Sequence, residues 1–237
     1  IYITDILKDK NTVNSQKGEC LMTFLMLKIK NPGEFKVNKS FLKSLFKGFR
    51  SEDGIETYLA EELDRYTSQF LFYLEDQKIT GTLRSGMKSS EPFAQYIRLF
   101  CHKNIAFLEF LNEKYTDEII EHVKKDHQVK LTRVALQNKN FLNIIDFYKK
   151  INIKQVDFID DEECSVSADV TNDLFEEGWP LKEVIQKHRV NIHFMSAEIP
   201  NVGLISFQRN GKVNINSLNG PTVEQLFKEI SDNVGAL

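Results

Sequence analysis

Residues 202–216 read VGLISFQRNGKVNIN, and this stretch predicts a β-hairpin. Apolar and polar residues alternate on both sides of an Asn-Gly turn signal, as in two paired strands. A two-residue loop would put the apolar residues of the two strands on opposite faces. A three-residue loop, in contrast, sets Phe207 opposite Val213. We therefore predict a type I turn with a bulge and a left-handed Gly211.

The residues around this hairpin predict further elements. Thr222 and Gln225 match a capping box at the start of a C-terminal helix, which carries an apolar stripe of Val223, Leu226, Phe227, Ile230 and Val234. Upstream, short apolar segments bounded by polar turns predict strands at residues 131–136, 155–159 and 191–195. Apolar spacing and end signals predict helices at residues 116–126, 140–151 and 181–188.

The N-terminal half reads as richer in helix. Apolar residues spaced three or four apart predict helices at residues 39–49, 54–66, 92–100 and 104–111. A hairpin is expected between residues 69–74 and 78–83, turning through Glu75-Asp76-Gln77. The spacing in its first limb fits both a strand and an extension of the preceding helix.

These elements predict an α+β fold, with a mixed α/β arrangement as the alternative. Residues 1–127 form a helix-rich lobe with a hairpin near 69–83. Residues 128–237 form an α/β lobe, in which a mixed sheet carries packed helices and a C-terminal hairpin and helix. The two lobes can also form one continuous domain. No stretch matches the motif of a known family.

Composition limits the class of protein. Of 237 residues, 41% are hydrophobic and 27% are charged, the ordinary range for a globular chain. No apolar run has the roughly 18 residues of a membrane span. Three cysteines that lie far apart, Cys20, Cys101 and Cys164, indicate free thiols and a cytoplasmic setting. The chain begins at Ile1 rather than Met, which allows for a missing N-terminal segment, and the unpaired cysteines argue against a cleaved signal.

A basic stripe is the first candidate binding site. On a helix, Lys39, Lys43 and Lys47 recur every four residues and Arg50 follows one turn later. A phosphate backbone binds to such a row of cations. No aromatic residue stands clearly among these lysines, so base stacking is not supported there. The alternative is a solvated face that pairs with the acidic segment after it.

A short loop provides a second basic cluster. Arg84 and Lys88 flank Ser85, Gly86 and Met87. Small residues and two cations suit a phosphate group held by backbone N–H groups. The spacing matches neither a P-loop nor a dinucleotide fingerprint, and an exposed loop is the alternative.

An acidic cluster gives the enzymatic alternative. Asp157 lies in an expected strand, and Asp160, Asp161 and Glu163 follow its end. Carboxylates at a strand end can hold Mg²⁺ or Mn²⁺, as in metal-dependent nucleases. Such enzymes usually also place a Lys nearby, and this stretch contains none. The competing interpretation is a solvent-exposed loop whose like charges repel one another.

Other catalytic signatures are missing from the sequence. There is neither an H-E-x-x-H nor a G-x-S-x-G motif, and the five histidines lack the spacing of metal ligands. This favours a protein that is not an enzyme and requires no cofactor.

We therefore expect a non-enzymatic protein that binds a macromolecule, with nucleic acid bound by the basic helix as the leading case and a protein partner as the other. The first alternative is a divergent Mg²⁺- or Mn²⁺-dependent nuclease or phosphoesterase. The second is a structural or assembly subunit whose opposite charge blocks pair between copies. The Lys, Ile, Asn and Phe bias is typical of AT-rich genomes, where motif-free proteins often come from mobile elements or antiviral defence.

Overall fold

The computed structural model describes residues 22–30, 54–81, 88–148, 150–159, 181–216 and 221–234. Strands make up 53% of the described residues and helices 29%, and the sheet is mostly antiparallel. The predicted helix-rich α+β fold is therefore wrong. The described residues divide into two compact units. We call them the meander unit, within Phe24–Ala135 and Glu224–Leu237, and the hairpin unit, within Ile1–Thr23 and Leu136–Val223.

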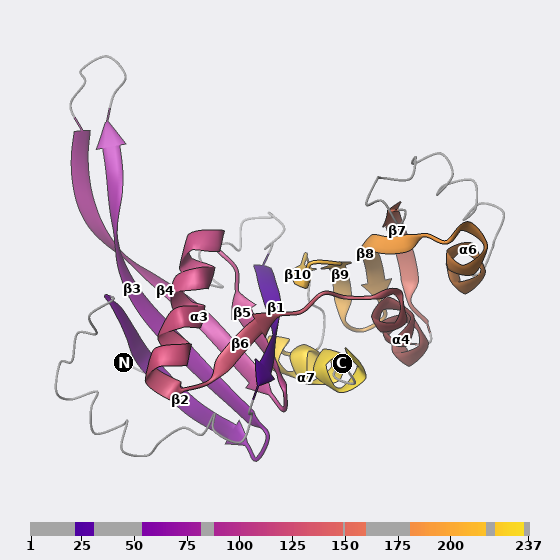
Figure 1. Ribbon diagram of the computed structural model, residues 1–237, viewed down its shortest axis with the longest axis horizontal. Coiled ribbons are helices and arrows are strands. Elements are labelled where there is room, and N and C mark those ends of the chain that lie inside the picture. The colour runs from indigo at the N-terminus through magenta and orange to yellow at the C-terminus, as the bar shows by residue number, and fades with distance from the viewer. Residues whose placement is uncertain are drawn as a thin grey trace. The chain divides into compact units, whose positions relative to one another are not determined.

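The meander unit is built on an antiparallel sheet (Figure 1). Its strands lie in the order β2-β3-β4-β5-β1, and β6 pairs with the last residues of β1. The bounds are β1 Met22–Lys30, β2 Ile55–Asp64, β3 Thr67–Gly81, β4 Lys88–His102, β5 Ile105–Glu109 and β6 Lys130–Arg133.

Helix α3 (Glu113–His127) covers one face of this sheet. Alternate residues of the strands face it, because side chains in a strand point to the two faces in turn. Asn112 caps the helix by accepting a hydrogen bond from the Tyr115 amide at 2.9 Å. The predicted helix is confirmed, but it begins before Thr116, the cap expected from the sequence. The α3 side of the core includes Leu25, Leu27, Phe70, Phe72, Ile97, Leu99, Ile119 and Val123.

Helix α7 (Val223–Val234) packs on the strands through Phe227. The Phe227 ring stacks on Phe107, with centroids 4.0 Å apart and planes 4° from parallel. Phe24 meets the same ring edge-on at 4.7 Å. Three residues of the apolar stripe predicted for the last helix, Leu226, Phe227 and Ile230, are thus buried in the core.

The predicted helix over residues 54–66 is wrong, and a bulge explains the error. Tyr58 has no partner in the register between β2 and β3, which shifts between Thr57 and Leu59. An extra residue in one strand breaks the two-residue alternation. The apolar residues then recur at a spacing of three or four, which resembles that of a helix.

The predicted helices over 92–100 and 104–111 are also wrong, because these residues form β4 and β5. Buried residues succeed one another in both strands, as in Leu99, Phe100 and Cys101. A strand covered on both faces reads as a continuous apolar run and loses its alternation. The short hairpin expected at residues 69–83 is instead one continuous strand, β3, paired along its whole length with β4.

The hairpin unit has strand order β10-β9-β8-β7. The β9–β10 register confirms the sequence prediction, with Phe207 opposite Val213 and Ile205 opposite Ile215. Gly211 has φ of +84°, the left-handed region that glycine adopts easily. The bounds are α4 Asn138–Tyr148, β7 Asn152–Ile159, α6 Leu181–His188, β8 Asn191–Ile199, β9 Gly203–Gln208 and β10 Lys212–Ile215.

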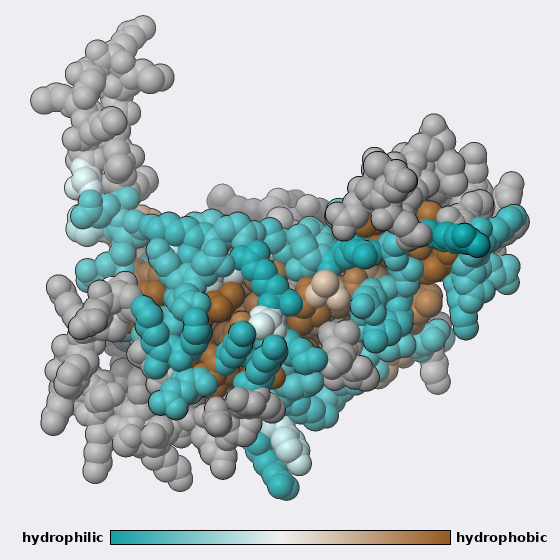
Figure 2. Space-filling model, viewed as in Figure 1, coloured by the Kyte–Doolittle hydropathy of each residue, from teal (hydrophilic) through white to brown (hydrophobic). Residues whose placement is uncertain are grey.

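Side chains at the start of α4 attach this helix to β8. The Asn138 side chain donates to the Val190 carbonyl at 3.1 Å and accepts from the Ile192 amide at 2.8 Å. In Figure 2 hydrophilic side chains cover much of the described surface in view, and hydrophobic ones show between them. Within the described ranges, no helix combines the length and apolarity needed to cross a bilayer.

Candidate functional site

Strands β3 and β4 extend beyond their neighbours as a two-stranded arm (Figure 1). The last partner of β3 on β2 is Leu74, whereas its pairing with β4 continues from Glu75↔Ala94 to Gly81↔Lys88. We call these paired residues, 75–81 and 88–94, the arm. At about 3.4 Å per residue it is roughly 20 Å long. Among the described residues no third strand pairs with it, so it projects as a β-ribbon.

Contacts from α3 hold the base of the arm. The Tyr115 hydroxyl donates a hydrogen bond to the Asp76 carboxylate, and Lys114 Nζ lies 3.8 Å from the same group. The hydrogen bonds from Tyr115 and from the Gln77 amide lower the pKa of Asp76. The same bond to Asp76, aided by burial, raises the pKa of Tyr115 to about 12. An isolated hairpin is marginally stable in water, so these contacts fix where the arm leaves the sheet.

The arm changes in charge from its base to its far end. Glu75 and Asp76 lie at the base, and Glu91 pairs with Lys78 midway along the arm. From Lys78 to Ser90 the sequence contains three cations and no acid, together with five hydroxyl residues and two glycines. Hydroxyls, cations and backbone amides are the groups that bind phosphate oxygens in nucleic-acid complexes. Arg84 and Lys88, chosen from the sequence, belong to this segment.

Three tyrosines cluster on the sheet face opposite α3. Tyr73 and Tyr96 are cross-strand partners whose ring centroids lie 5.5 Å apart at 62°. Tyr58 approaches Tyr96 edge-on, at 5.8 Å and 77°. The β2 bulge gives Tyr58 this direction, while its neighbour Thr57 faces α3 and lies 3.4 Å from His122. Tyr58 is 43% exposed, and the other two rings are half-buried.

Two carboxylates lie beside Tyr73 of this cluster. Tyr73 donates a hydrogen bond to Glu75 at 3.2 Å, and Glu56 is its partner in the β2–β3 register. Partial burial and the charges of Glu75 and Glu56 raise the pKa of Tyr73. Arg98, two residues along β4 from Tyr96, forms an ion pair with Glu109 at 3.2 Å.

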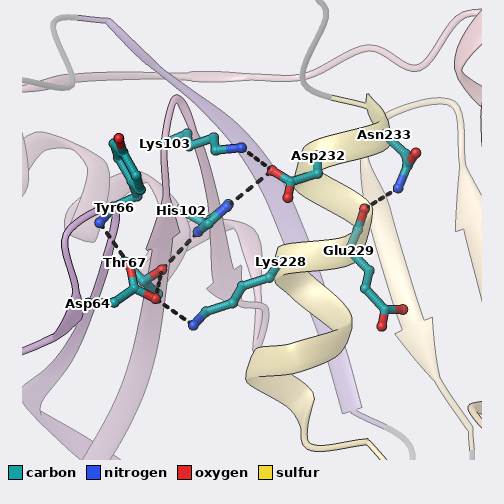
Figure 3. Close-up of polar contacts among 9 residues, drawn as sticks. All are labelled: Asp64, Tyr66, Thr67, His102, Lys103, Lys228, Glu229, Asp232 and Asn233. Carbon is teal, nitrogen blue, oxygen red and sulfur yellow. Dashed lines mark hydrogen bonds and ion pairs between the residues drawn. The ribbon is translucent and has the colours of Figure 1, made fainter.

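A polar network fastens α7 to the turns of the meander (Figure 3). Lys228 donates to Asp64 at 2.6 Å, and Asp64 also accepts from the Thr67 hydroxyl at 2.9 Å. His102 bridges Thr67, at 2.8 Å, and Asp232, at 3.2 Å. These contacts connect the β2–β3 turn and the end of β4 with one side of α7.

The order hydroxyl, imidazole, carboxylate also occurs in hydrolase triads, but here it has a structural role. Thr67 is 1% exposed, so a substrate cannot reach its oxygen. Its hydroxyl also donates a hydrogen bond to Asp64, so this proton is not directed at His102 as a nucleophile's would be. The network therefore positions α7, and we assign it no catalytic function.

Both acids of the network are kept ionised. The hydrogen bonds from Lys228 and the Tyr66 amide hold the pKa of Asp64 well below its usual range. Burial opposes ionisation of Asp232, but the hydrogen bonds from Lys103 and His102 outweigh it and lower the pKa of this carboxyl. Two carboxylates thus remain charged against cations on neighbouring elements.

The residues chosen from the sequence lie mostly outside the described ranges. These are Lys39, Lys43, Lys47, Arg50, Arg84, Asp160, Asp161 and Glu163. Lys88 begins β4, at the far end of the arm, and pairs with Gly81. Asp157 is exposed on β7 and accepts a hydrogen bond from Gln155 at 2.9 Å. The phosphate-binding and metal-binding sites therefore stay predictions.

Sequence reasoning missed the tyrosine cluster and the arm. Tyr58 and Tyr96 were assigned to helices, where nothing brings them together. If the two segments had been predicted as paired strands, the alternation of side chains would have placed Tyr73 and Tyr96 on the same face of the sheet. The equal lengths of β3 and β4 were hidden by the polar residues Glu75-Asp76-Gln77, which resemble a turn.

Two further observations complete the site. Among the described residues no three His, Cys, Asp or Glu side chains group as a metal site would require. No family model matches this chain, and no curated protein is significantly similar to it in sequence.

Proposed function

We propose that this protein binds nucleic acid, with the arm and its far-end cations as the main contact. The observation that supports this is a β-ribbon about 20 Å long, in which residues 79–90, beyond the Lys78–Glu91 pair, contribute two cations and five hydroxyls but no acid. The major groove of B-DNA, about 12 Å wide, admits a two-stranded β-ribbon. The function requires no catalytic group.

The proposal assigns roles to particular residues. Arg84 and Lys88 would neutralise phosphates, and the serines and threonines around them would donate hydrogen bonds to phosphate oxygens. The basic stripe of Lys39, Lys43, Lys47 and Arg50 would extend the same electrostatic contact. Such contacts carry affinity and position the protein without reading base sequence.

The rigid base of the arm also supports this function. Tyr115 and Lys114 both contact Asp76 from α3, so the ribbon leaves the sheet in a fixed direction. A contact element that is already ordered loses less conformational entropy on binding than a flexible loop. The acids at the base would keep phosphates toward the far end.

Fluorescence anisotropy tests the proposal with labelled single-stranded DNA, duplex DNA and RNA of about 20 nucleotides, the scale of common binding sites. We expect binding that weakens steeply as salt rises. R84Q/K88Q should weaken binding to every probe, as should K39Q/K43Q/K47Q. The matched control is K124Q/K125Q, which removes two cations from α3 and should leave binding nearly unchanged. Equal effects of R84Q/K88Q and the control would reject the arm as the contact.

A further inference from the structure

We propose that the tyrosine cluster, Tyr58, Tyr73 and Tyr96, together with Glu56 and Glu75, binds an arginine side chain of a protein partner. This site is separate from the proposed nucleic-acid contact and does not depend on it. Aromatic rings attract cations over their faces, and guanidinium groups stack well on them. The neighbouring carboxylates add favourable charge and can accept the guanidinium hydrogen bonds.

The geometry of the rings favours this ligand. Both ring contacts are steeply inclined, at 62° and 77°, so in each the edge of one ring meets the face of its neighbour. Tyr58, at 43% exposure, offers the most accessible face. The ring-to-ring distances of 5.5 and 5.8 Å leave no room for a cation between the rings. The cation would therefore lie on the cluster, as a stacked guanidinium does.

Charge decides between the possible partners. Tyr73 donates a hydrogen bond to Glu75 and lies opposite Glu56 in β2. Arg98, two residues along β4 from Tyr96, is already paired with Glu109. A phosphate backbone would be repelled here, which separates this surface from the far end of the arm. A cationic side chain gains both the carboxylate charge and the ring faces.

The same chain uses this kind of contact internally. The Arg65 guanidinium lies 5.3 Å from the Tyr66 ring centroid, and Arg98 lies 5.8 Å from that of Phe24. Lys114 Nζ stands 5.5 Å from the Tyr115 ring. The three rings stand on a sheet face and Tyr58 is 43% exposed, so an arginine held by a larger partner fits the cluster better than a free small cation, which needs an enclosing pocket.

The test uses three labelled peptides of one length, in which the same positions are Arg, Lys or Gln, and measures their binding to the full chain by anisotropy. We expect the Arg peptide to bind several-fold more tightly than the Lys peptide, and the Gln peptide not to bind. Y58L/Y96L keeps apolar bulk but removes two ring faces, and should remove the preference for Arg over Lys. E56Q/E75Q keeps the side-chain shapes and should weaken binding of the Arg peptide by roughly fivefold, the size of one exposed ion pair.

The control variant is E118Q/E121Q, which makes the same charge change on α3. It should alter binding of the Arg peptide by less than about twofold, the effect of a distant screened charge. If E118Q/E121Q weakens binding of the Arg peptide as much as E56Q/E75Q does, the attraction comes from the net charge of the protein and the proposal is wrong. Equal binding of the Arg and Lys peptides also overturns it. Nucleic-acid binding, measured on the same variants, should persist, so failure of one proposal does not imply failure of the other.

Discussion

The hydroxyl of Tyr115 donates a hydrogen bond to the carboxylate of Asp76 at the point where β3 leaves the sheet. This contact joins the N-terminal part of α3 to the first residues of the arm. It also explains two opposite shifts, because one hydrogen bond lowers the pKa of Asp76 and raises the pKa of Tyr115 to about 12.

Removing this hydroxyl should destabilise the meander unit. Y115F keeps the ring but loses a bond to a charged acceptor, at an expected cost of about 1 to 2 kcal/mol in the free energy of unfolding. Because the pKa of Tyr115 is raised to about 12, from about 10 in the unfolded chain, the contribution is complete below pH 10. It disappears as the pH rises through about 12. Urea unfolding at neutral and alkaline pH measures both effects. The exposed Tyr66 gives the control Y66F, which should change stability by less than about 0.5 kcal/mol.

Docking of α7 should depend on apolar contacts far more than on its ion pairs. F227A removes a ring that stacks on Phe107 and meets Phe24 edge-on, and should cost about 3 to 5 kcal/mol. F147A truncates a ring that is 44% exposed and should cost less than about 1 kcal/mol. Urea unfolding compares the two, and similar costs would show that Phe227 is not a core contact.

Acid should weaken the attachment of α7. The pKa values of Asp64 and Asp232 are both lowered by folding, so each carboxylate stabilises the fold above its unfolded pKa of about 3.9. That contribution is lost as the pH falls through the lower folded values. D64N/D232N should therefore be less stable than the parent protein at neutral pH, and the difference should shrink below about pH 4. Urea unfolding at a series of pH values tests this, and pH profiles that stay parallel into acid would contradict it.

Cys101 should report opening of the sheet. Its side chain is buried in the α3 side of the core, and burial raises the pKa of the thiol well above its usual value. In a C20S/C164S background, Ellman's reagent should not react with the folded protein and should react fully in urea. Fast labelling under native conditions would mean that β4 opens easily.

The sequence allowed the end of the chain to be predicted well. The Asn-Gly turn with alternating neighbours gave the correct β9–β10 register, and helices α4, α6 and α7 were found at close to their true positions. These elements carry their own local signals, such as turn residues and a one-sided apolar stripe. Their type could be predicted without knowing which segments they pack against.

The first half failed because its strands lack such signals. The bulge at Tyr58 disturbs the alternation in β2, and burial on both faces hides it in β4 and β5. Glu75-Asp76-Gln77 looked like a turn, yet Glu75 and Gln77 are exposed in β3, where polar residues fit a strand. Contacts such as that between His102 and Asp232, which are 130 residues apart, depend on the complete fold and have no local signal.

The most direct test of nucleic-acid binding by the arm is the slope of log affinity against log salt for the parent chain and R84Q/K88Q. Each phosphate contact adds about 0.9 to this slope on duplex DNA, so losing two should flatten it by about 2. K124Q/K125Q, measured in the same way, should keep the parent slope. Binding with an unchanged slope in R84Q/K88Q, or no binding by the parent chain at low salt, would contradict the account.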